Sequence, residues 1–138
     1  MNQIPNTNDA LVLRTDFSDE AASETICTAI QEPVGEFRAY LDFVSDSKND
    51  GITTEQILPL IPDAFDHSFI FIVDQVALSH PENPILVVDL YAERSRTFRV
   101  MPSEMWGVEN NLSIANLEFD EFVDAADPDG VLRDFSQI

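Results

Sequence analysis

The sequence predicts a single domain of the α/β (or α+β) class, with a mixed sheet of about five strands and three to four helices. Three observations carry this prediction. The chain has 138 residues, which is the usual size of one domain. Almost continuous apolar runs at 68–73 and 85–91 are typical of strands buried on both faces. Helix-like and strand-like segments alternate along most of the chain.

The first third predicts a tail, a strand and a helix. Residues 1–9 are polar and predict a flexible tail, so the domain is expected to cover 10–138. An apolar strand is expected over 10–17, followed by Ser18 as a helix N-cap. Pro33 and Gly35 end that helix. Its apolar face consists of Ala22, Ile26, Ala29 and Ile30.

Residues 37–44 alternate between two faces, which predicts a half-buried strand. One face would carry Phe37, Ala39, Leu41 and Phe43. The other would carry Arg38, Tyr40, Asp42 and Val44. A loop is expected over 45–51, and Thr53 with Gln56 predicts a capping box for a short helix that Pro62 stops.

The second half predicts strands at 68–73, 85–91 and 96–101, the last two joined as an antiparallel hairpin because only residues 92–95 separate them. A short helix or ordered loop is expected over 103–111. A short edge strand is expected over 112–117. A helix is expected over 119–126, before a packed or frayed C-terminal tail.

The composition excludes one class of function. The chain holds 26 acidic and 7 basic residues, for a net charge of −19. Such a field repels nucleic-acid phosphates and anionic lipid, so we expect no direct binding of either. Cys27 is the single cysteine, and no basic region precedes an apolar run at the N-terminus. These features predict a cytoplasmic protein without disulfides or a secretory signal.

Three aspartates suggest one possible catalytic site. Asp16, Asp74 and Asp89 each lie at or near the end of an apolar strand. If the strands run parallel, these carboxylates meet at one edge of the sheet and could hold Mg²⁺. The alternative is that each aspartate ends a strand or caps a helix, and under this alternative no cofactor is expected.

Three of the seven basic residues lie close together, at Arg94, Arg96 and Arg99. They could form an anion-binding pocket. We favour the alternative, in which they pair with C-terminal acids and attach the last helix to the hairpin.

The most distinctive local sequence is MWGVENNL, which contains Trp106. A lone tryptophan beside glycine and two asparagines could form a binding loop or fill a gap in the core. The residues considered for an interaction surface are Trp106, Glu109, Asn110, Asn111, Asp120, Glu121 and Asp124.

The chain resembles a family of small acidic bacterial proteins known only as a domain of unknown function. The segments that carry the resemblance are LVLRTDFSDEAA, PVGEFRAYLDFVSD, HSFIFIVD, LVVDLYAERSRTFRV and PSEMWGVENNLSIANLEFDEF. They span about residues 11 to 122. The resemblance implies an intact bacterial domain and supplies no activity, cofactor or catalytic residue.

Three functions follow from these patterns. The first is a non-catalytic interaction or inhibitor protein that acts on a basic partner surface, with a homodimer as a possible assembly. The second is a Mg²⁺-dependent hydrolase or phosphotransferase that uses the strand-end aspartates. The third is a structural domain whose acidity serves solubility alone. We rank the interaction protein first and the enzyme last.

Overall fold

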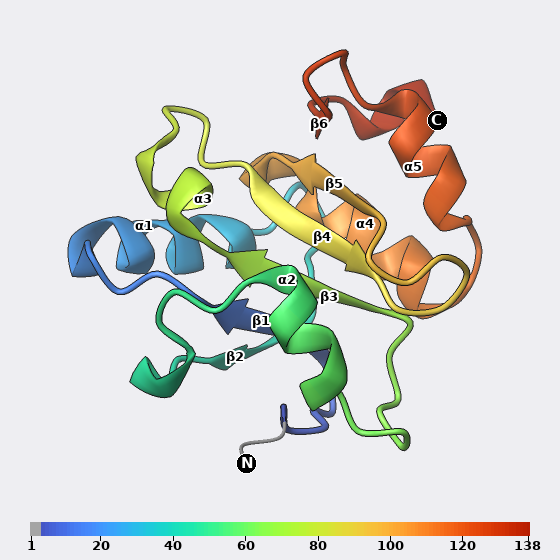
Figure 1. The fold of residues 1–138 in the computed structure, drawn as a ribbon. Coiled ribbons are helices and arrows are strands. Elements are labelled where there is room, and N and C mark those ends of the chain that lie inside the picture. The colour runs from blue at the N-terminus through green and yellow to red at the C-terminus, as the bar shows by residue number, and fades with distance from the viewer. Residues whose placement is uncertain (1–3) are drawn as a thin grey trace.

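A mixed β-sheet forms the centre of the computed structural model, which describes residues 4–138 (Figure 1). Within that range the sheet has six strands in the order β2-β1-β3-β4-β5-β6. The strands are β1 (Ala10–Arg14), β2 (Leu41–Val44), β3 (Phe69–Val73), β4 (Ile85–Asp89), β5 (Thr97–Val100) and β6 (Val131–Leu132). The α/β class and the mixed sheet are confirmed, and the two-residue β6 accounts for the strand beyond the predicted five.

The sheet contains both parallel and antiparallel pairs of strands. β1 runs parallel to both β2 and β3, and β5 runs parallel to β6. β4 runs antiparallel to β3 and to β5, so the predicted hairpin of β4 and β5 is confirmed. β1 and β3 therefore end at one end of the sheet, whereas β4 ends at the opposite one.

Five α-helices occur in residues 4–138. They are α1 (Glu20–Gln31), α2 (Thr54–Ile57), α3 (Gln75–Ser79), α4 (Met105–Ser113) and α5 (Phe119–Ala125). The capping box of Thr53 and Gln56 is confirmed at the start of α2. No helix in this range is long and apolar enough to cross a membrane.

The helices cover the two faces of the sheet unequally (Figure 1). On one face, residues of α1, α3, α4 and α5 pack against the strands around Phe71 and Phe122, which are fully buried. On the other face, α2 and Ile4 cover Leu11, Leu13 and Ile70. Every residue of β1 and β3 is buried, as expected for strands enclosed between two layers.

Several predicted elements differ from the structure. The N-cap of α1 is Asp19, whose side chain accepts from the backbone N–H of Ala22, because Ser18 is bound instead by Asp16. The strand predicted over 112–117 is wrong, since Leu112 lies inside α4 and is buried. The sequence did not predict α3, a five-residue helix capped by Asp74.

The predicted tail over residues 1–9 falls partly on residues 1–3, which lie outside the described range. Residues 4–9 contact the domain. Ile4 is 2% exposed, and its N–H donates to the carbonyl of Leu60 at 2.8 Å. The Asn6 side chain bonds to Asp66, and the carbonyl of Thr7 lies 2.8 Å from His67 Nε2.

Candidate functional site

The three strand-end aspartates lie at opposite ends of the sheet. Asp16 and Asp74 follow the parallel strands β1 and β3, and both line a hollow of about 400 Å³. Asp89 ends the antiparallel strand β4, where it pairs in register with Phe69 at the start of β3. The prediction that the three carboxylates converge is therefore wrong. Residues 4–138 contain no group of three or more His, Cys, Asp or Glu side chains that could hold a metal ion.

Asp74 is bound by its own surroundings. Its carboxylate accepts two hydrogen bonds from the Arg99 guanidinium, at 2.9 and 2.7 Å, and one from the N–H of Ala77 at 3.1 Å. Arg99 also donates to the carbonyl of Pro84 at 3.1 Å. A bidentate ion pair of this kind fixes the orientation of both side chains. It joins the start of α3 to β5 and compensates the charge of Asp74.

Asp16, in the same hollow, is also partly buried. Asp16 Oδ1 accepts from both the N–H and the hydroxyl of Ser18, and these bonds lower the pKa of Asp16. The preceding Arg14 is buried and donates to the carbonyl of Asp16 at 2.9 Å and to Glu20 at 2.9 Å. These contacts order the turn between β1 and α1.

Asp89 organises a tight turn at the other end of the sheet. Its carboxylate accepts from three successive backbone N–H groups, those of Tyr91, Ala92 and Glu93, at 2.9, 3.2 and 3.0 Å. The residue is 2% exposed. Such a carboxylate satisfies backbone donors that would otherwise lack partners, so Asp89 shapes the β4–β5 hairpin.

The three clustered arginines have separate partners and form no common anion pocket. Arg99 pairs with Asp74, as described. Arg96 pairs with Glu93 and Asp120 and lies over the Phe119 ring. Arg94 donates to the carbonyl of Leu58 at 3.4 Å. The Arg96–Asp120 pair does connect α5 to the hairpin, as the alternative interpretation predicted.

Arg96 and Asp89 line a second hollow of about 270 Å³, together with Leu112 and Phe119. Arg96 Nε is the one buried side-chain polar atom in residues 4–138 that lacks a hydrogen-bond partner. Two carboxylates already compensate this guanidinium, so its net attraction for an anion is small.

Trp106 lies in α4, half-buried between two aromatic rings. It stacks on Phe37 with ring centroids 4.9 Å apart and an interplanar angle of 18°, and it meets the edge of Phe135 at 5.2 Å. The neighbouring Gly107 allows the Phe135 ring to approach the helix, because a Cβ there would lie 2.6 Å from the ring. Trp106 therefore lies in a helix and not in a loop, and its ring packs against Phe135 on one side and against the exposed Phe37 on the other.

The polar residues after Trp106 hold a neighbouring segment. Glu109 is 4% exposed, and its carboxylate accepts from the N–H of Tyr40 at 2.6 Å and the hydroxyl of Ser113 at 2.6 Å. Asn110 donates to the carbonyl of Arg38 at 2.9 Å. These contacts attach residues 38–40 to α4. Asn111 bonds within its own helix, to the carbonyl of Gly107.

The acidic residues considered on α5 have different surroundings. Asp120 pairs with Arg96, and Glu121 accepts from the N–H of Glu118 at 2.7 Å in a capping box. Asp124 is exposed to solvent.

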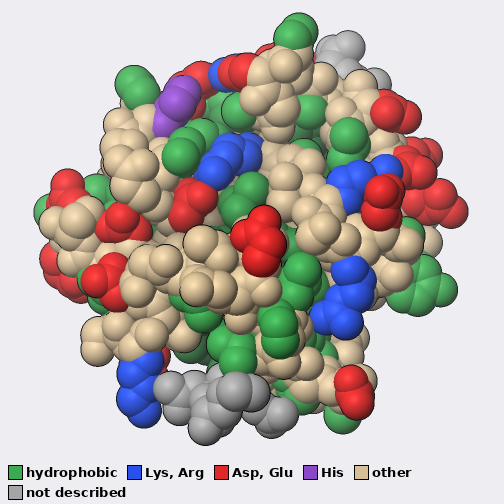
Figure 2. Space-filling view, viewed as in Figure 1, with side chains coloured by type: hydrophobic (Ala, Val, Ile, Leu, Met, Phe, Trp, Pro, Cys, Tyr) green, Lys and Arg blue, Asp and Glu red, His purple; other side chains and the backbone are tan. Residues whose placement is uncertain are grey.

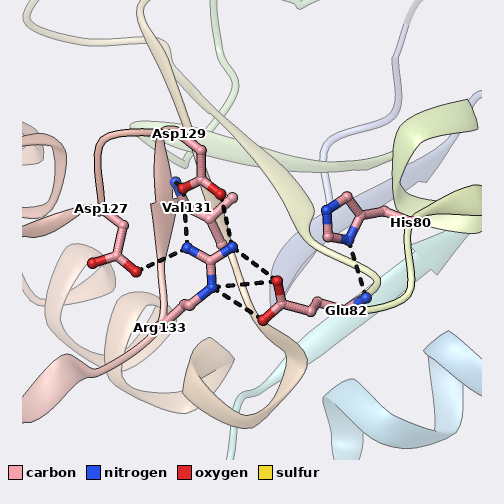
Figure 3. A network of polar contacts seen from close by, with 6 residues as sticks. All are labelled: His80, Glu82, Asp127, Asp129, Val131 and Arg133. Atoms are coloured by element: carbon pink, nitrogen blue, oxygen red, sulfur yellow. Dashed lines mark hydrogen bonds and ion pairs between the residues drawn. The ribbon is translucent and has the colours of Figure 1, made fainter.

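Sequence reasoning missed a cluster around Arg133 (Figure 3). The Arg133 guanidinium lies among three carboxylates, Glu82, Asp127 and Asp129, at 2.7 to 2.8 Å. Hydrogen bonds from Arg133 lower the pKa of Asp129 to about 2, and they raise the pKa of Arg133. The cluster ties the C-terminal β6 to the loop after α3. The one sign of this cluster in the sequence is that Arg133 is the single basic residue after Arg99.

Ion pairing in the described residues uses four of the seven basic residues and leaves a mostly acidic surface. Within residues 4–138, four arginines pair with seven carboxylates, whereas the chain has 26 acidic residues. Figure 2 shows acidic side chains gathered at two margins of the viewed face, over α1 and over α5. The exposed acids include Glu24 in α1, Glu32 at the C-cap of α1, and Asp124 in α5.

Comparison with known proteins gives a family and no activity. No curated protein sequence matches the chain. The sequence profile of DUF6924, a domain of unknown function, matches residues 9–135 and thus almost the whole domain. This match confirms the resemblance to a domain of unknown function that the sequence segments carried. The chain belongs to the DUF6924 family.

Proposed function

We propose that this protein is a non-catalytic interaction module that binds a basic surface of a partner protein. The observation that carries the proposal is the distribution of charge. Four of the seven cations form ion pairs within the molecule, as for Arg14, Arg99 and Arg133, and most carboxylates face outward. A partner therefore meets a mostly acidic surface, on which Arg38, Lys48 and Arg94 are the exposed cations.

Such a surface acts at long range. Its field raises the rate at which a basic protein arrives in the right orientation, and salt screens this effect. The same field repels nucleic acid and anionic membranes, which excludes them as partners. The proposal includes a cytoplasmic location, which is supported by the single, half-buried Cys27.

Affinity capture from the organism that encodes the protein tests this proposal. The tagged chain is incubated with lysate at about 0.01 M and about 1 M salt, where the screening lengths are about 30 and 3 Å. We expect a specific basic protein at low salt and little of it at high salt. The identified partner is then purified, and its affinity is measured by calorimetry.

Two triple variants make the test specific for charge. Glu24→Gln, Glu32→Gln and Asp124→Asn together remove three exposed charges, and we expect weaker binding. Glu24→Asp, Glu32→Asp and Asp124→Glu keep the charge and change the side-chain length, so binding should persist. Failure to recover a specific basic partner at either salt would contradict the proposal and leave solubility as the role of the acidity.

A further inference from the structure

One segment of this acidic protein exposes more apolar surface than the rest. The described residues expose eight large apolar side chains, and four of them lie between positions 34 and 43. They are Val34, Phe37, Tyr40 and Phe43, with exposed fractions of 42%, 47%, 50% and 37%. Solvent-exposed aromatic rings in one short segment are typical of a contact surface.

This segment leads into a free edge of the sheet. β2 is the terminal strand, and β1 is its sole partner within the described residues (Figure 1). The carbonyl of Tyr40 accepts from Ala10 of β1 at 3.2 Å, which sets the direction of the backbone groups. Because these groups alternate along a strand, those of Leu41 and Phe43 point away from β1. They are the donors and acceptors that an added strand would use.

The edge is already ordered before anything binds. Glu109 and Asn110 hold the backbone of Tyr40 and Arg38, and Phe37 stacks on Trp106. The strand predicted over 37–44 is shorter than expected, since β2 covers Leu41–Val44. Leu41 contacts the core on one face and Val44 the core on the other, whereas Phe37 and Phe43 are exposed. An ordered edge loses little conformational entropy when a second strand pairs with it.

The charges around this edge select the occupant. Glu36, Asp42 and Asp46 lie along it, and the one cation between them, Arg38, lies over the Tyr40 ring at 4.7 Å. A second copy of this chain also carries −19 charges, so repulsion opposes self-pairing. A segment with basic and apolar side chains at alternate positions matches both the acids and the exposed rings.

We propose that the basic partner docks by adding an extended segment, with alternating basic and apolar residues, as a strand beside β2. The apolar side chains pack on Phe37 and Phe43, and the backbone pairs with Leu41 and Phe43. This inference rests on the proposed function and names the place and form of the contact.

A titration with model peptides tests the inference on the intact chain. The main probe is an alternating lysine–valine peptide of about eight residues, slightly longer than an average strand. An octalysine peptide carries charge without the pattern. We expect the lysine–valine peptide to bind more tightly, and its binding to shift the backbone amide NMR signals of Leu41 and Phe43. Equal affinity of the two peptides, or shifts over α1 and α5 alone, would overturn the docking site and leave the proposed function standing.

A pair of matched variants separates the site from general charge. Phe43→Lys adds one positive charge and removes an aromatic ring at the edge. Tyr91→Lys makes the same change at a side chain that is 83% exposed and lies beyond the end of β4. We expect about tenfold weaker lysine–valine binding for Phe43→Lys and little change for Tyr91→Lys. Similar effects of both substitutions would overturn the inference.

Two further results separate the outcomes. If neither cationic peptide binds at low salt, the proposed function itself fails. If sedimentation shows a dimer of the free protein that Phe43→Lys dissociates, the occupant of the edge is a second copy, and the inference is wrong about the partner. The amide shifts of the unmodified protein keep the test decisive even if Phe43→Lys reduces its stability.

Discussion

Replacement of Glu109 should release the segment that leads into β2. Its carboxylate is almost fully buried and accepts from Tyr40 N at 2.6 Å, Ser113 Oγ at 2.6 Å and Asn110 Nδ2 at 3.0 Å. A hydrogen bond to a charged group contributes about 1.5 to 3 kcal/mol, and such contributions within one network do not add fully. We therefore expect Glu109→Ala to lower the free energy of unfolding by about 3 to 5 kcal/mol.

Glu109→Gln should have a smaller effect. The amide oxygen still accepts from Tyr40, but the negative charge is lost, so we expect a decrease of about 1 to 2 kcal/mol. Urea unfolding measures both values, and hydrogen exchange at the Tyr40 amide reports the local change. That amide should lose protection in Glu109→Ala more than amides of β3 do.

Asp124→Asn is the matched control, because it removes one acidic charge from an exposed helix position. We expect its free energy of unfolding to stay within about 0.5 kcal/mol of the parent. If Glu109→Ala behaves like Asp124→Asn, the buried carboxylate does not hold the segment, and the reasoning about an ordered edge is refuted.

Three other predictions follow from local contacts. Gly107→Ala should lower the free energy of unfolding by about 1 to 3 kcal/mol, because the new Cβ meets the Phe135 ring, and this clash outweighs the better helix propensity of alanine. Urea unfolding measures this loss, and Phe135→Leu in the same chain should recover part of it. The Asp129 pKa of about 2 lies below the ordinary value of about 3.9, so the stability from its contact with Arg133 is present above pH 4 and is lost as the pH falls toward 2. The difference in urea midpoint between the parent and Arg133→Gln should therefore narrow across that window, and a constant difference would contradict the assignment. Burial raises the pKa of Cys27, so its thiol should react with iodoacetamide at about pH 8 more slowly in the folded than in the urea-unfolded chain, and equal rates would show an accessible thiolate.

Features set by near neighbours in the chain were predictable from the sequence. The capping box of Thr53 and Gln56 was predicted correctly because both partners lie within one helical turn. The apolar runs of β3 and β4 indicated burial on both faces, because successive residues of a strand point to opposite faces and all of them are apolar up to Asp89. The N-cap of α1 was predicted one residue early, because the Ser18 hydroxyl donates to Asp16 and the Asp19 carboxylate accepts from the N–H of Ala22 instead.

Features set by distant parts of the chain were not predictable. Asp74 and Asp89 lie at opposite ends of the sheet because β3 and β4 are antiparallel. An apolar run in the sequence does not show whether its strand runs parallel or antiparallel to its neighbours. Arg133 lies four and six positions from Asp129 and Asp127, but its third partner, Glu82, comes from the loop after α3, some fifty positions away, so spacing could not reveal the complete cluster. The residue types of segment 112–117 suit a strand as well as a helix. Leu112 lies in α4 because it packs into the core on one face of the sheet.

The rate of association with the captured basic partner, measured by stopped flow over a range of ionic strength, tests the central claim most directly. An interaction steered by the acidic surface should associate many times faster at about 0.01 M than at about 1 M salt. The charge-removing triple variant should reduce that dependence, and the charge-conserving variant should retain it. A rate constant that does not change with salt would contradict the claim that the acidic surface of this protein recruits its partner.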